Sequence, residues 1–276
     1  MLSRRAVFTA AALLLAACAG RQGAHAADEI TPAPTPAQWA ALAKLPDWSG
    51  IWTPDIRDQN RRAATDPTPW TPAAAAQIAH LIAEDRAGRP KGLFVDCLPE
   101  AMPSWMLISH NPLEILFTPG RVTTLGDSDG NRLRRIYTDG RSHPADPDPS
   151  LHGDSVGHWE GDTLVIDTVA VAPQAIIAIS ESVGLPNNGG MHVVERIRLT
   201  SPDILQDDLE ITAPKVLTRP WKTSRIYYRK RQRNFEIREG VCLQGMFIEA
   251  VDKDGNAIFE PLPHEIGGAP LPPVSR

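Results

Sequence analysis

The stretch GHWEGDTLVIDTV, residues 157–169, predicts a β-hairpin. One segment with strand character comes before the turn EGD, residues 160–162, and a second segment follows it. Gly, Asn and Asp are the residues that tight turns need, because they tolerate a positive φ. The same turn chemistry recurs at residues 127–131 and 252–256. Sequential hairpins of this kind build an antiparallel meander.

Short segments divided by turn residues continue along the chain from Leu113 onward. A meander removes its exposed edges most simply by closing. The sequence therefore predicts a mainly β fold, an antiparallel meander closed into a small barrel, with an open sandwich as the alternative. The segments predicted as strands are Leu113–Phe117, Arg121–Gly126, Arg132–Thr138, Ser155–Trp159, Thr163–Val169, His192–Leu199, Leu205–Thr212, Thr223–Arg231, Phe235–Glu239 and Phe247–Asp252.

One or two helices are expected to flank the barrel. Thr71 can cap a helix that has Pro72 in its first turn and continues from Ala73 to Arg86, with apolar residues at helical spacing. Gly88 and a following proline end it. A shorter helix is expected within residues 38–44.

The composition is that of an ordinary globular protein, with 42% hydrophobic and 22% charged residues in a chain of 276. The 26 prolines and 20 glycines suit strands divided by turns better than helices. A net charge of -5, with no sustained Lys/Arg run, gives no electrostatic surface for nucleic acid or an anionic membrane. We therefore expect a small-molecule ligand or substrate as the partner, and the sequence leaves the oligomeric state open.

The N-terminal segment has the parts of an export signal. Arg4 and Arg5 precede an apolar run at residues 6–17, and small residues follow it. The paired arginines are also compatible with twin-arginine export. Cleavage before Cys18 would leave a lipid-anchored protein, whereas cleavage after Ala26 would release it. Both alternatives predict an exported protein, either periplasmic or lipid-anchored to the cell envelope.

The chain is expected to hold one domain between a linker and a tail. Residues 1–26 form the signal segment, 27–46 a linker, 47–260 a single β-rich domain and 261–276 a Pro-rich tail. Export leaves two cysteines in the domain, Cys97 and Cys242. Two thiols in an oxidising compartment usually pair, so a disulfide between them is expected, with two separate buried thiols as the alternative.

Three motifs carry a resemblance to known proteins. They are Tyr-x-Asp-Gly-Arg-x-His-Pro at residues 137–144, Gly-His-Trp-Glu-Gly-Asp-Thr-Leu-Val-x-Asp-Thr at 157–168, and His-x-x-Glu-Arg at 192–196. With a cysteine near each end of the domain, the chain resembles a widespread family of exported bacterial proteins. This resemblance supports the segment boundaries and the disulfide and implies no particular activity. Asn187–Gly190 departs from the acidic residue or Ser that is frequent there in similar proteins. The short Glu-Gly-Asp turn also resembles calycin barrels.

The candidate acid–base residues are Glu195, His158, His192 and Tyr137. Residues i and i+2 of a strand face the same way, so Glu195 shares the apolar face of its strand with Val193. A carboxylate there needs a partner or a raised pKa, which makes it either a structural ion pair or a working acid or base. If these residues are catalytic, Glu195 or His158 removes a proton, and Tyr137 or His192 supplies one.

The candidate substrate-binding residues are Arg135, Arg141, Tyr227 and Arg225. Arg135 shares a strand face with Tyr137, and Arg225 shares one with Tyr227. If these faces point inward they line a pocket that suits an amphipathic or aromatic molecule with an acid or phenol group. The alternative is that they form a solvated outer face.

No cofactor or metal is predicted. Imidazole and carboxylate donors are present, but their spacing matches no metal-binding motif. The chain has no Gly-x-Ser-x-Gly elbow and no Gly-rich phosphate loop. The candidate metal ligands are His143, Asp146, His152, Asp154 and His158.

The favoured function is a cofactor-independent enzyme of the cell envelope, of lyase or isomerase type, that does acid–base chemistry on a small amphipathic substrate. The first alternative is a non-catalytic barrel that binds or carries a hydrophobic small molecule. The second alternative is a structural lipoprotein of the envelope.

Overall fold

The fold is described here from a computed structural model, which describes residues 32–93, 95–108, 112–126, 132–237, 248–251 and 257–259. The signal segment, Cys18, Cys242 and the Pro-rich tail lie outside these residues, so the predicted lipid anchor and disulfide stay predictions. The chain divides into a unit of residues Met1–Thr35 and a unit of residues Pro36–Arg276. Everything that follows concerns the second unit.

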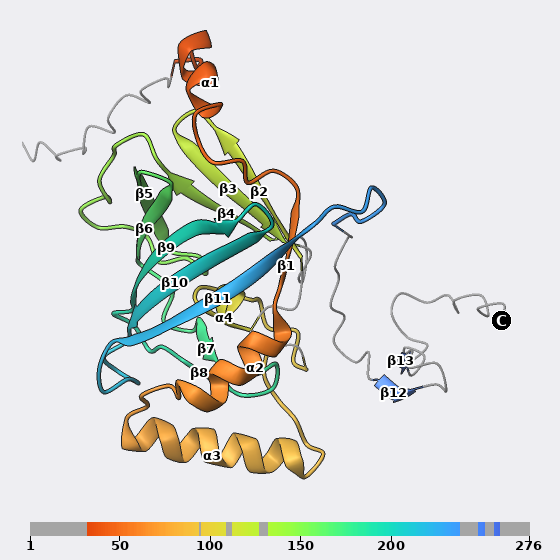
Figure 1. The fold of residues 1–276 in the computed structure, drawn as a ribbon. Helices are drawn as coiled ribbons and strands as arrows, with labels where there is room; N and C mark the ends of the chain where they lie inside the picture. Colours follow the sequence, from red (N-terminus) through yellow and green to blue (C-terminus); the bar gives the residue numbers. More distant parts are fainter. Residues whose placement is uncertain are drawn as a thin grey trace, which may run out of the picture. The chain divides into compact units, whose positions relative to one another are not determined.

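The second unit is built around a closed barrel of nine strands, which confirms the predicted fold class (Figure 1). Around the barrel the strand order is β1-β11-β10-β9-β6-β5-β4-β3-β2. The strands are β1 (Ile51–Pro54), β2 (Leu113–Thr118), β3 (Arg121–Gly126), β4 (Leu133–Tyr137), β5 (Asp154–Glu160), β6 (Thr163–Val169), β9 (His192–Ser201), β10 (Ile204–Thr212) and β11 (Trp221–Lys230).

The barrel departs from a simple meander at three places. β4 pairs with β5 in parallel, through Tyr137 and Val156. β6 pairs with β9 because β7 (Ile176–Ala178) and β8 (Gly184–Pro186) form a sheet of their own. β1 closes the barrel by pairing with both β11 and β2. Sequential hairpins therefore account for most of the wall but not for its closure.

Eight of the ten predicted strands correspond to strands of the barrel, and β1 is a barrel strand that was not predicted. Residues 235–237 of the segment predicted as Phe235–Glu239 are not in a strand. The segment predicted as Phe247–Asp252 corresponds to β12 (Ile248–Val251), which pairs with β13 (Ala257–Phe259) in a separate sheet and not in the barrel.

Four helices accompany the strands in the described part of the chain, at α1 (Pro36–Leu42), α2 (Ile56–Thr65), α3 (Pro72–Arg86) and α4 (Ser104–Leu107). The prediction of α3 is confirmed, since the Thr71 side chain accepts a hydrogen bond from Ala74 N. α2 was not predicted, because it is polar and buries none of its residues. Asp55 caps it by accepting from Asp58 N. Among the described residues no helix has the length and apolar character to cross a membrane.

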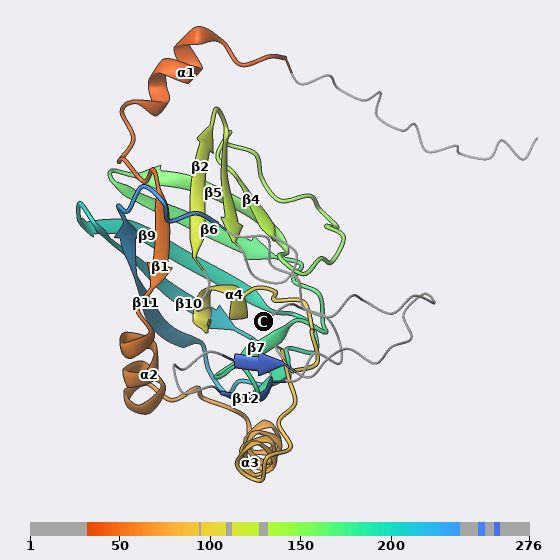
Figure 2. The same ribbon diagram turned by 90° about the vertical axis from the view of Figure 1, so that its right-hand side faces the viewer.

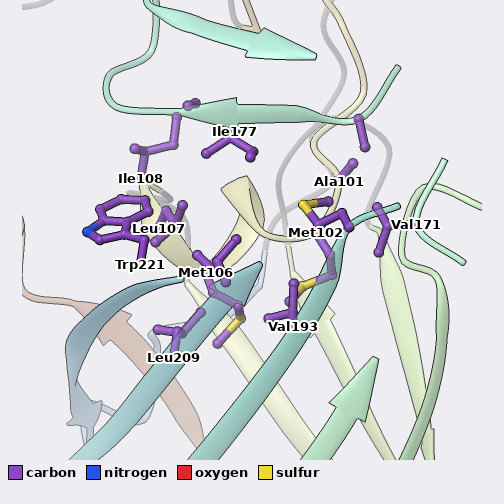
Figure 3. Packing of buried hydrophobic residues seen from close by; sticks show 14 of the residues in the cluster. Ala101, Met102, Met106, Leu107, Ile108, Val171, Ile177, Val193, Leu209 and Trp221 are labelled. Carbon is purple, nitrogen blue, oxygen red and sulfur yellow. The ribbon is translucent and has the colours of Figure 1, made fainter. Parts of the chain in front are cut away.

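The helices α2, α3 and α4 lie at the end of the barrel where β11 begins (Figure 2). α4 is fully buried there, and its Met106 and Leu107 pack near Leu209 and Trp221 of the barrel (Figure 3). Ser104 fixes α4 to β7, because its hydroxyl accepts a hydrogen bond from Ala178 N at 2.9 Å. This end of the barrel is therefore covered by helices rather than open.

Candidate functional site

A buried ion pair joins β4 to β9 inside the barrel. Arg134 donates to both carboxylate oxygens of Glu195, at 2.9 and 2.5 Å, and these side chains are 2% and 0% exposed. Arg134 also donates to Ser155 Oγ at 3.2 Å and to Thr168 Oγ1 at 2.8 Å. The prediction that Glu195 lies on the inner, apolar face is confirmed. Its carboxylate is held in a bidentate pair, as expected of a structural partner.

Two adjacent arginines of β4 point in opposite directions. Arg134 and Ile136 are buried, whereas Arg135 is exposed and Tyr137 is half-buried on the outer face. Arginine occurs on both faces of this strand, so alternation alone could not identify the inner one. Arg134 is the inward-facing arginine because it pairs with the carboxylate of Glu195. The hypothesis that Arg135 and Tyr137 line the interior is therefore wrong.

The outer wall of the barrel carries a chain of alternating histidines and aspartates. His143 Nδ1 lies 2.5 Å from Asp154 Oδ1, and His143 Nε2 lies 3.3 Å from Asp167 Oδ1. His192 Nε2 lies 2.7 Å from the same Asp167 oxygen. His143, Asp167 and His192 come from the three sequence motifs, one residue from each. We call these four residues the outer network.

The motif around Tyr137 adds a guanidinium and a phenol beside this network. Arg141 Cζ lies 3.9 Å from the ring centre of Tyr137, and its Nη2 lies 2.6 Å from Asp139 Oδ2. The hydrogen bond from Arg141 lowers the pKa of the Asp139 carboxyl. Tyr137, Arg141 and His192 of the predicted set therefore lie on the outer wall, close to the His143 loop.

His158 does not belong to the outer network. Its side chain is 65% exposed, and Nε2 lies 3.2 Å from Glu160 Oε1. Glu160 also accepts from Arg196, at 2.5 Å. The four predicted catalytic residues are thus divided by the barrel wall, with Glu195 inside and His158, His192 and Tyr137 outside. They do not form one site.

A pocket of about 570 Å³ lies at the helix-covered end of the barrel. We call it the mouth pocket. Its lining comes from α2, α3, α4, β11 and the segment that joins β7 to β8. Its apolar lining residues include Trp70, Ile78, Leu107, Ile108, Ile179 and Trp221.

Arg225 supplies a buried guanidinium to the mouth pocket. It is 5% exposed, and Tyr227 on the same face is fully buried, so the predicted inward orientation of both is confirmed. Arg225 Nε donates to Leu107 O at 2.6 Å. Its Nη1 donates to Thr223 Oγ1 at 2.8 Å and to Ser224 O at 2.7 Å. Three acceptors therefore fix the plane of the guanidinium.

Arg225 lies opposite the buried Asp207 in the register of β10 and β11. Among the described residues, no acid forms an ion pair with Arg225, and no hydrogen-bond acceptor is found for its Nη2. Burial lowers the pKa of Arg225, whereas Tyr227 and the carboxylates of Asp207 and Asp58 raise it. Tyr227 plays a different part, because its hydroxyl donates to Met106 O at 3.2 Å and thereby anchors α4.

Sequence reasoning missed Asp207, a further acid inside the barrel. It is 0% exposed, and within the described structure neither of its carboxylate oxygens has a hydrogen-bond partner. Burial raises the pKa of Asp207 well above its ordinary range, and the nearby charge of Glu195 raises it further. Asp207 lies between the buried Leu205 and Leu209. The sequence signal that could have identified Asp207 is the same one that identified Glu195, namely an acid on the apolar face of a strand.

The candidate metal ligands do not form one site, because His143 contacts Asp154 whereas His158 contacts Glu160. Burial lowers the pKa of His152 to about 4, with the charge of Arg134 contributing. Over the described residues, no group of three or more His, Cys, Asp or Glu side chains is arranged to hold a metal ion. Searches of protein-family models and of curated proteins give no match to this chain.

Proposed function

We propose that this protein is an exported barrel that binds a small amphipathic molecule in the mouth pocket. The observation that carries this proposal is a pocket of about 570 Å³ whose apolar lining contains one buried cation. Ligand pockets commonly have volumes of about 300–1,000 Å³ and combine apolar walls with a few placed polar groups. The mouth pocket fits that description.

Binding is a better account of the interior than catalysis. Glu195 is engaged by Arg134 through both carboxylate oxygens, so it is not available to remove a proton from a substrate. The predicted proton donors, His192 and Tyr137, lie on the opposite side of the wall. Arg225 and the apolar side chains around it remain, and they can hold a molecule without transforming it.

A neutral fluorescent probe tests this proposal directly. N-phenyl-1-naphthylamine should bind the protein, and Ala63→Trp should weaken its binding at least tenfold, because Ala63 lines the pocket. Ala64→Trp is the matched control, since Ala64 is exposed on the same helix and is not part of the lining. Equal binding by both variants, or no binding by the wild type, would contradict the proposal.

Acid–base chemistry on the outer wall is the second candidate function, in keeping with a lyase or isomerase that needs no cofactor. The observation that favours it is the outer network, where imidazoles and carboxylates lie 2.5 to 3.3 Å apart. His192→Ala and Asp167→Asn should then abolish the turnover of a substrate found by screening. His80→Ala, an exposed histidine of α3, is the control. Full turnover by His192→Ala would exclude this candidate.

Export and the state of the cysteines are part of the same proposal. Mass spectrometry of the full chain expressed in an exporting host would identify cleavage at Cys18 or after Ala26. A mature mass two hydrogens below that of the reduced chain would support the Cys97–Cys242 bridge. A chain that keeps its N-terminal segment would count against export.

A further inference from the structure

We propose that the mouth pocket selects an amphipathic monoanion, a carboxylic acid whose carboxylate pairs with Arg225. This inference rests on the proposed binding function and adds the chemical class of the ligand. Four features support it, which are the buried charge of Arg225, its unused donor, the other charges around the pocket and the apolar lining.

A buried cation is unfavourable unless an anion or a set of acceptors compensates for its lost hydration. Arg225 has the acceptors, which are two backbone carbonyls and the Thr223 hydroxyl. Asp207 stands opposite it in the sheet, but no ion pair joins the two side chains. Arg134 has the same degree of burial and does have one. A ligand carboxylate would give Arg225 the partner that Glu195 gives Arg134.

The hydrogen bonds from Nε and Nη1 of Arg225 hold its guanidinium plane in place. Among the described residues its Nη2 is left without an acceptor, and the side chain lines the pocket. A guanidinium that is fixed before binding loses less conformational entropy when the ligand arrives. The site is therefore organised to accept an oxyanion without rearrangement.

The charges around the pocket suit a ligand with a single negative charge. Arg62 adds a second cation to the lining, but Asp58 accepts from its Nε at 2.7 Å. Asp66, which is half-buried, and Asp85, which is exposed, also line the pocket. Because like charges repel, these acids oppose a second carboxylate, whereas the buried cation attracts the first. A single carboxylate at Arg225 is therefore favoured, and a second carboxylate near the rim is disfavoured.

Apolar side chains make up much of the remaining lining. Trp70, Ile78 and Trp221 present apolar surface around the guanidinium. Burying an apolar body there contributes roughly 25 cal/mol per Å² of area removed from water. A small hydrophilic acid would forgo this contribution. The ligand class is thus an acid with an aliphatic or aromatic body.

The test compares ligands that differ only in their charge. Decanoate, decanol and decanedioate compete with N-phenyl-1-naphthylamine for the wild type and for Arg225→Met, at neutral pH. We expect the wild type to bind decanoate at least tenfold more tightly than decanol, and more tightly than decanedioate. In Arg225→Met this preference for the acid over the alcohol should disappear, while the affinity for decanol stays within about threefold. Arg198→Met, on the outer wall, is the control that should keep the preference.

The outcomes separate the two proposals. If the wild type binds decanol and decanoate equally, the inference fails and the binding function stands. If the preference survives in Arg225→Met, another cation causes it and the inference fails. If no probe binds, the binding function itself fails. Arg225→Lys covers the case in which Arg225→Met does not fold, since it should keep a preference for decanoate that is weaker than that of the wild type.

Discussion

Two buried arginines of this barrel have opposite surroundings. Arg134 meets Glu195 in a bidentate ion pair and also bonds two hydroxyl groups. Arg225 is held by carbonyls and one hydroxyl, lines the mouth pocket and forms no ion pair with an acid of the described structure. The two side chains are nearly equally buried, so burial does not distinguish them. Their partners distinguish them. Arg134 forms an ion pair within the fold, whereas we propose that Arg225 pairs with an anionic ligand.

The regions around Arg134 and around Arg225 therefore have different roles inside the barrel. The ion pair of Arg134 connects β4 to β9 across β5 and β6, so it stabilises the wall where β4 and β5 pair in parallel. Arg225 instead connects β11 to α4 through Leu107 O. The first region is a cluster of side-chain hydrogen bonds around one ion pair, whereas the second combines a fixed donor with a pocket. Variants of each region should show that separation.

The largest effect is expected from Arg134→Met. It leaves the carboxylate of Glu195 buried without its partner, and breaking a buried ion pair in this way costs about 3–5 kcal/mol. The free energy of unfolding should fall by that amount in urea denaturation. The double variant Arg134→Met, Glu195→Leu is the control and should recover most of the loss. A loss below about 1 kcal/mol in Arg134→Met would remove the contrast between the two arginines.

Asp207 lies between the two regions and should give the wild type a pH dependence. The folded chain retains a proton on Asp207 because burial raises its pKa, whereas the unfolded chain releases it above about pH 4. The free energy of unfolding of the wild type therefore decreases as the pH rises above that value. Asp207→Asn cannot ionise, so its stability relative to the wild type should increase by up to about 1.4 kcal/mol per pH unit.

Urea denaturation of both proteins between about pH 4.5 and 7.5 measures this difference. The paired acids whose pKa is lowered affect both proteins equally, so they cancel in the comparison. Parallel stability profiles would show that Asp207 ionises normally in the folded chain.

Alternation of residue types predicted much of this fold but could not resolve its charged faces. The barrel, α3 and the inward orientation of Glu195 and Arg225 follow from local patterns that the structure confirms. β4 was misread because arginines stand on both of its faces, and only the remote Glu195 determines which one is buried. A pattern within one strand cannot contain that information.

The mouth pocket could not be predicted for a related reason. Its lining comes from segments that are distant in sequence, including the polar helix α2 and the connection between β7 and β8. α2 buries none of its residues, so no apolar periodicity revealed it. The outer network is similar, because three separate motifs meet only after β5, β6 and β9 pair.

A smaller stability effect is expected from Arg225→Met than from Arg134→Met. The variant leaves Leu107 O and Ser224 O without their donor, which destabilises the fold, but it also removes an unpaired buried charge. We expect a net loss of about 1–2 kcal/mol in urea denaturation. Decanoate at one fixed concentration should stabilise the wild type more than this variant, because the variant binds it more weakly. A loss as large as that of Arg134→Met would mean that Arg225 is chiefly structural.

The smallest loss of stability is expected from variants of the outer wall, where water weakens ion pairs and charged hydrogen bonds. His143 bonds Asp154 and faces Asp167, and its side chain is about one-fifth exposed. His143→Ala should cost about 1 kcal/mol, against under about 0.5 kcal/mol for the exposed His158→Ala, as measured by urea denaturation. His143→Ala should also speed proteolysis of residues 138–153, because these contacts tie that loop to β5 and β6. If both variants lose the same free energy of unfolding, the outer network does not stabilise the fold. Any role of these residues would then be chemical.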